Sequence, residues 1–100
     1  MDKYNIRILP IAEQDIDAAV DHLLQEDPSV ALSFLDGMEL IEQQLSTFPN
    51  SGAPVQEKRY ADLGYRFMIN CGHYVFYTFR DDIIWIARVV RARRDYTKLL

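Results

Sequence analysis

Apolar and polar residues alternate in the first segment, residues 4–9 (YNIRIL), and this period of two predicts a short strand. Pro10 ends the alternation. From Ala12 the apolar residues recur at three- and four-residue spacing, which predicts a helix that continues to about Glu26. The apolar positions of this helix are Ala12, Ile16, Ala19, Val20, Leu23 and Leu24.

A second helix is predicted to begin at Asp27-Pro28. Asp27 can cap the free amides of the first turn, and proline suits the first helical position because its missing N–H has no helical partner there. The turn-forming residues 49–52 end the helix. Its apolar positions are Ala31, Phe34, Leu35, Met38, Ile41, Leu45 and Phe48. We therefore expect two antiparallel helices that form a hairpin.

Three strand-like runs follow a turn-rich loop over residues 50–64. They cover residues 65–70, 74–80 and 83–90, and their connections are short enough for hairpins. The order strand, helix, helix and three strands predicts a single α+β domain over residues 1–100. In this fold a three-stranded antiparallel meander joins the N-terminal strand in one sheet, and the helical hairpin covers one face.

The second and third strands of the meander are apolar on both faces. In the last strand, strict alternation puts Ile84, Ile86, Arg88 and Val90 on one face and Ile83, Trp85, Ala87 and Val89 on the other. The helices can cover one face. The other face is covered either by the loop and the C-terminal residues or by a partner.

Charge is distributed unevenly along a chain whose net charge is −4. Residues 1–47 hold ten acidic and two basic residues, whereas residues 48–100 hold five acidic and nine basic ones. An electrically polarised surface of this kind is compatible with an anionic partner despite the overall acidity. No stretch has the length and hydrophobicity of a membrane span or secretory signal, so we expect a cytoplasmic protein without a membrane partner.

Several kinds of chemistry have no sequence support. Cys71 is the single cysteine, and no histidine and cysteine cluster has the spacing of a metal site. No glycine-rich phosphate loop is present, and His22 and His73 lack a nucleophile at a telling spacing, so ordinary polar roles are expected for both. The sequence therefore predicts no cofactor and no metal.

Basic side chains gather at the start and the end of the predicted meander. They are Lys58, Arg59 and Arg66 at the start, and Arg88, Arg91, Arg93, Arg94 and Lys98 at the end, around Tyr96. Arg88 shares an apolar strand face, so its guanidinium must be paired or must reach a cavity. Its partner is an acid, either Asp95 or a carboxylate on a helix, or else a bound phosphate. The last basic residues form either a solvated tail or, with Tyr96, a surface that stacks a base and holds its phosphate.

The motifs also form an ordered series. A first strand leads into LP and DI (residues 9–10 and 15–16), the hairpin ends near FP (48–49), and GYRFMI (64–69), YVFYTF (74–79) and IARVVRARRDYTKLL (86–100) follow. Over nearly its whole length the chain thus resembles the RelE/ParE family of toxins from bacterial type II toxin–antitoxin modules. That resemblance implies a tight complex with an antitoxin, whose acidic and apolar segment wraps the toxin.

The resemblance implies two alternative targets. RelE-like members cut messenger RNA in the ribosomal A site, and ParE-like members share the fold but poison DNA gyrase. For RNA cleavage, the resemblance gives catalytic roles to Lys58, Arg59, Arg66, Arg88 and Tyr96. The remaining C-terminal basic residues would bind nucleic acid. Arg91-Ala92 departs from the family pattern, because His-Gly is common at this point.

The chemistry of RNA cleavage tests this assignment. Attack by a 2′-hydroxyl needs a proton acceptor, a group that stabilises the charged phosphorane, and a proton donor for the leaving oxygen. Arginines stabilise charge but stay protonated, so Lys58 or Tyr96 would have to move the protons. The first hypothesis is a ribosome-dependent endoribonuclease, the second a gyrase poison, and the third a binding module of the same fold without activity.

Overall fold

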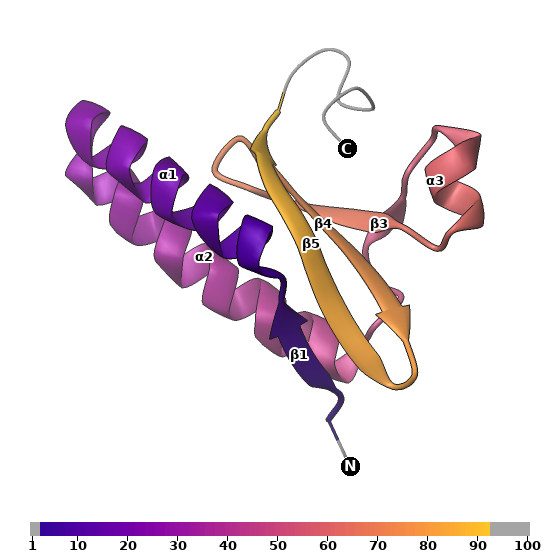
Figure 1. The fold of residues 1–100 in the computed structure, drawn as a ribbon. Coiled ribbons are helices and arrows are strands. Elements are labelled where there is room, and N and C mark those ends of the chain that lie inside the picture. The colour runs from indigo at the N-terminus through magenta and orange to yellow at the C-terminus, as the bar shows by residue number, and fades with distance from the viewer. Residues whose placement is uncertain (1–2, 93–100) are drawn as a thin grey trace.

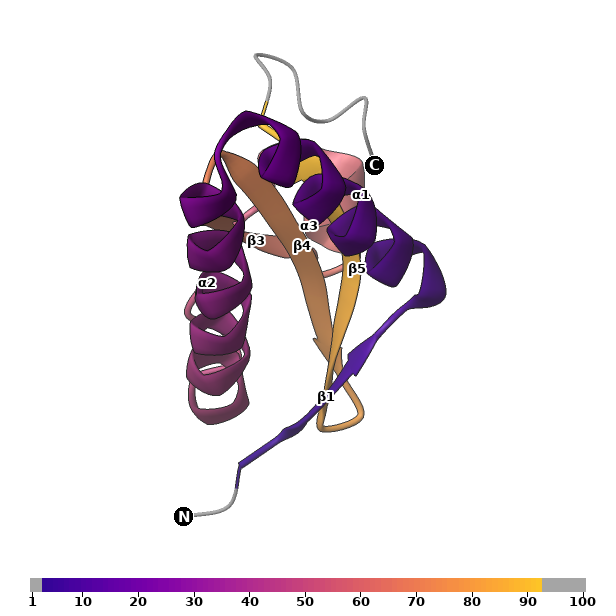
Figure 2. The ribbon, with the colours of Figure 1, turned by 90° about the vertical axis from the view of Figure 1, so that its left-hand side faces the viewer.

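The computed structural model describes residues 3–92 and shows the expected α+β fold. Arg93, Arg94, Tyr96 and Lys98, as well as Asp95, lie outside the described residues. The elements are β1 (Asn5–Ile8), α1 (Pro10–Glu26), α2 (Pro28–Thr47), β2 (Ala53–Pro54), α3 (Lys58–Asp62), β3 (Arg66–Asn70), β4 (His73–Arg80) and β5 (Ile83–Arg91). The predicted helical hairpin, α1 and α2, lies on one side of the sheet (Figures 1 and 2).

The sheet has five strands in the order β1-β5-β4-β3-β2. The β3-β4-β5 meander is antiparallel, whereas β1 runs parallel to β5 and pairs with residues Ile83–Ile86. The hairpin turns hold Cys71-Gly72 and Asp81-Asp82, all four with positive φ. Such turns match the right-handed twist of a two-residue hairpin, which explains why connections this short suffice.

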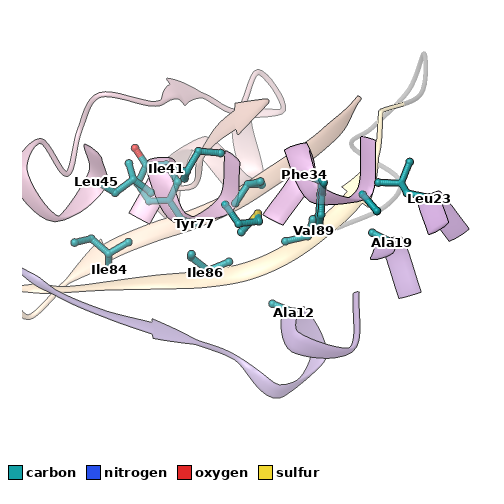
Figure 3. Packing of buried hydrophobic residues seen from close by; sticks show 13 residues of the cluster. Ala12, Ala19, Leu23, Phe34, Ile41, Leu45, Tyr77, Ile84, Ile86 and Val89 are labelled. Atoms are coloured by element: carbon teal, nitrogen blue, oxygen red, sulfur yellow. The ribbon is translucent and has the colours of Figure 1, made fainter. Parts of the chain in front are cut away.

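The hydrophobic core lies between the helical hairpin and one face of the sheet (Figure 3). Phe34 and Leu45 of α2 are fully buried against Tyr77 of β4 and against Ile84 and Ile86 of β5. The predicted helix start is confirmed, because the Ser29 N–H donates to Oδ1 of Asp27 at 3.0 Å. The hydrophobic pattern therefore identified the elements that build this core.

Two details differ from the sequence prediction. The segment predicted as a loop contains β2 and α3, which are two and five residues long and so too short to show a hydrophobic period. Three apolar residues assigned to the buried helix stripes are exposed: Leu24 at 49%, Leu35 at 44% and Phe48, which follows the end of α2, at 61%. They lie at the margins of the apolar stripes. The part of each helix that is buried against the sheet is narrower than the stripe that the sequence predicts.

Gly37 lies where α2 approaches β3 closely. A Cβ at this position would lie 2.8 Å from Cγ of Asn70 and would overlap its Oδ1. Asn70 is held there because its Nδ2 donates to the Phe34 carbonyl at 2.9 Å. The glycine thus lets the helix and the strand come together.

We predict that Gly37→Ala lowers the free energy of unfolding by about 1–3 kcal/mol, although alanine is normally the better helix former. Urea denaturation measures the change. In an Asn70→Ala background the overlap is absent, so the same substitution should become neutral or stabilising. A loss of equal size in both backgrounds would show that Asn70 is not the cause.

Candidate functional site

Arg88 is held by a carboxylate on α1. Its Nε donates to Oδ2 of Asp15 at 2.8 Å and its Nη2 donates to Oδ1 at 3.2 Å. The two side chains are 29% and 16% exposed, so the pair is largely removed from water. The hydrogen bonds to Asp15 raise the pKa of Arg88 against the opposing effect of burial. Asp15 is thus a helix-borne carboxylate, one of the partners expected for Arg88 from the sequence.

Asp15 also completes the hydrogen bonding of β5. The β1–β5 ladder ends at Ile86, and α1 then continues beside the upper part of β5 (Figures 1 and 2). There the Val89 N–H donates to Oδ2 of Asp15 at 3.0 Å. A buried strand amide without a partner would be costly, so one carboxylate satisfies both the strand edge and the guanidinium.

The predicted face of Arg88 is wrong, because β5 contains a bulge. Phe76 pairs with Arg88 and Tyr77 with Ile86, which leaves Ala87 without a partner in β4. The extra residue shifts the alternation. Val89 therefore joins Ile84 and Ile86 in the core, and Arg88 lies with Phe76 on the face turned away from the hairpin.

Arg66 holds a loop against the face of the sheet that is turned toward the hairpin. Its Nη1 donates to the Gly52 carbonyl at 2.8 Å, and the Gly52 N–H donates to Oη of Tyr77 at 2.9 Å. Burial raises the pKa of Tyr77, although the Gly52 N–H and the charge of Arg66 oppose the shift. A side chain at Gly52 would meet the Tyr77 ring at 2.7 Å, so the loop needs glycine at this point.

The strand register separates Arg66 from Arg88. Arg66 pairs with Tyr77, which pairs with Ile86, so these three residues share the hairpin-facing side of the sheet. Arg88 pairs with Phe76 on the opposite side. The two strand-borne cations of the predicted catalytic set therefore do not converge.

Lys58 and Arg59 lie on α3, away from the hairpin (Figure 1). Nζ of Lys58 donates to Oδ2 of Asp62 at 2.8 Å, but the side chain is 86% exposed, so this bond contributes little stability. Arg59 lies over the Tyr60 ring and 3.5 Å from Oε2 of Glu57. Oε2 of Glu57 is buried and makes no hydrogen bond within the described residues. The ion pair with Arg59 therefore only partly compensates the cost of burying this oxygen.

Arg91 ends β5 beside α1. Its Nη1 lies 3.3 Å from Nε2 of His22. Nε2 of His22 also lies 3.4 Å from Oε1 of Glu26. The imidazole nitrogen can accept from Arg91 when it is unprotonated or donate to Glu26 when it is protonated, but not both. A cavity of about 300 Å³ brings Arg91 and His22 together with Asp15 and His73.

Sequence reasoning missed the role of Asp15. Several acids lie in the first turns of the helix, and no local pattern distinguishes the one that meets β5. Within residues 3–92, no group of three or more acidic, histidine or cysteine side chains is arranged to hold a metal ion. None of the helices in this part of the chain is long and apolar enough to cross a membrane.

We predict that Asp15→Ala lowers the free energy of unfolding by about 2–3 kcal/mol, because it leaves both Arg88 and the Val89 amide without their acceptor. Arg88→Ala should cost less, since Asp15 still accepts from Val89. In a double-mutant cycle, the two losses should not add. Asp17→Ala, an exposed acid of the same helix, is the matched control. Additive losses would contradict the pairing.

Comparisons with known proteins agree on the class of this fold. Residues 6–96 match the family model described as "ParE toxin of type II toxin-antitoxin system, parDE". A chain of a chromosomal ParDE toxin–antitoxin system from P. aeruginosa superposes with a TM-score of 0.71 at 20% identity, over 91% of this chain and 98% of that one.

A second solved structure, the RelBE2 toxin–antitoxin complex from Mycobacterium tuberculosis, gives a TM-score of 0.56 at 19% identity, over 90% of this chain and 99% of that one. The search of curated proteins returned no match. At these identities the solved structures establish the fold, and the family model, which spans nearly the whole chain, establishes the class. The chain belongs to the ParE toxin family of type II toxin–antitoxin systems, within the RelE/ParE fold.

Proposed function

We propose that this toxin arrests growth by poisoning DNA gyrase, the action that the resemblance implies for ParE-like members. The observation that carries the proposal is the separation of Arg66 from Arg88 on opposite faces of the sheet. The match to the ParE family model supports the same choice.

RNA cleavage requires its groups to surround one phosphate. The base, the acid and the group that stabilises the phosphorane must each lie within hydrogen-bond reach of the reacting atoms. Arg66 donates to a loop carbonyl and Arg88 donates to Asp15, so part of the donor set of each guanidinium is already used within the fold. Arg91 stands where an imidazole could have moved a proton. Binding to a protein target does not require these groups to surround one phosphate.

Ribosome-dependent RNA cleavage is the second candidate, and the exposure of Lys58 favours it. At 86% exposure this side chain is free to leave Asp62 and meet RNA. Under this alternative Lys58 and Tyr96 move the protons, and Arg59, Arg66 and Arg88 stabilise charge. Arg91, Arg93, Arg94 and Lys98 then contact the RNA backbone. An inactive binding module is the third candidate, and no observation on residues 3–92 favours it.

We also propose that a cognate antitoxin binds and neutralises the toxin. The similar solved structures come from a ParDE system and from a RelBE2 toxin–antitoxin complex. Exposed apolar side chains, such as Leu32 and Leu40 at 65% each, are compatible with a protein that buries part of this surface.

We predict that the purified toxin, added to DNA gyrase and supercoiled plasmid, traps cleaved DNA that becomes linear after denaturation and protease treatment. Addition of the antitoxin should abolish the linear product. In a cell-free translation system, transcript ends should stay unchanged. Transcripts cut on ribosomes, together with intact plasmid in the gyrase reaction, would instead establish the endoribonuclease.

A further inference from the structure

A small cavity opens on the face of the sheet turned away from the hairpin. Thr78 of β4 pairs with Trp85 of β5 on this face. Their neighbours along the two strands, such as Tyr77 and Ile84, place their side chains in the core on the opposite face. The cavity has a volume of about 230 Å³, and we call it the Trp85 cavity. It is lined by Leu9, Tyr65, Thr78, Arg80, Trp85 and Ala87.

The polar groups of the Trp85 cavity are available for a ligand. Thr78 is 4% exposed, yet its hydroxyl makes no hydrogen bond within residues 3–92, and neither does the indole N–H of Trp85. Arg80 has no ion pair in that part of the chain. The same holds for Arg7, which the parallel register places beside Trp85 on the same face. Arg66 and Arg88 differ from these two arginines because each donates side-chain hydrogen bonds to a protein acceptor.

The size and composition of the cavity favour one inserted side chain. Cavities for small-molecule ligands usually measure about 300–1,000 Å³, so this smaller volume suits a single ring or branched aliphatic group. Tryptophan, tyrosine and arginine are the residues most enriched at the centres of protein interfaces, where they form pockets around a partner's anchor residue. All three types line this cavity.

Local charge argues against a nucleic-acid ligand at this place. Asp81 and Asp82 directly follow Arg80 and form the exposed β4–β5 turn. Binding along a phosphate backbone needs several cations that act together. Here two arginines lie near two carboxylates, so the field is close to neutral. A rim of mixed charge is typical of protein contacts.

We propose that the Trp85 cavity is the anchor site for the protein that this toxin inhibits. It accepts one apolar or aromatic side chain of that protein, with a neighbouring carboxylate placed to reach Arg80. A tight antitoxin complex needs about 1,200–2,000 Å² of buried surface, and a cavity for one side chain supplies little of that area. It suits recognition of one feature on a folded enzyme, and naming gyrase as that enzyme rests on the proposed function.

The test measures the toxin concentration that gives half-maximal DNA cleavage by gyrase. Arg80→Glu and Trp85→Ala should each raise it at least tenfold, because one reverses the rim charge and the other removes the aromatic wall. Lys3→Glu, an exposed cation on the N-terminal side of β1, changes the net charge as much as Arg80→Glu and should leave the concentration unchanged. Antitoxin binding by all three variants should match the wild type, and circular dichroism checks independently that each variant is folded.

If Arg80→Glu and Trp85→Ala need the same toxin concentration as the wild type for half-maximal cleavage, the inference is overturned while the proposed function stands. A parallel loss of antitoxin binding by the folded Arg80→Glu variant assigns the cavity to the antitoxin and also overturns it. If the wild-type toxin causes no DNA cleavage by gyrase, the proposed function is wrong. Growth arrest by the same variants then tests the Trp85 cavity independently of gyrase. Relief of arrest supports the anchor site, and arrest at the wild-type level overturns it.

Discussion

The Asp15 carboxylate at the edge of β5 is the interaction on which the rest of this structure depends. β1 pairs with only half of that strand, and the chain then turns into α1 beside the other half. Asp15 accepts from Nε and Nη2 of Arg88 and from the Val89 amide. Hydrogen bonds to a charged group contribute about 1.5–3 kcal/mol each. One side chain thereby fixes the helix against the strand and completes the edge of the sheet.

That arrangement changes what the basic residues can do. A cation that is bound to a protein carboxylate or carbonyl orders the fold, and fewer of its N–H groups remain for a substrate. Arg88 and Arg66 are in this position, whereas Arg7 and Arg80 have no ion pair within the described residues. We therefore propose that the function resides not at Arg66 and Arg88 but at the surface around Trp85, where recognition of a protein needs no proton transfer.

The elements that build the core could be predicted from sequence because their hydrophobic periods are long enough to read. β2 and α3 could not, since two and five residues are too short for a hydrophobic period to repeat. The face of Arg88 could not be predicted either, because the bulge at Ala87 adds one residue without any local signal in an apolar strand. Which acid of α1 meets β5 depends on how that helix packs against the strand. A local sequence pattern does not determine this tertiary packing, so Asp15 could not be identified in advance.

Hydrogen exchange at the Val89 amide shows whether Asp15 completes the edge of β5 in solution. This N–H faces Asp15 of α1 rather than a strand, and we predict that it exchanges as slowly as the amides of the β4–β5 ladder. In Asp15→Ala its exchange should accelerate at least tenfold more than that of the ladder amides. Rapid exchange at Val89 in the wild-type protein, or an unchanged rate relative to the ladder after the substitution, would contradict this role of Asp15.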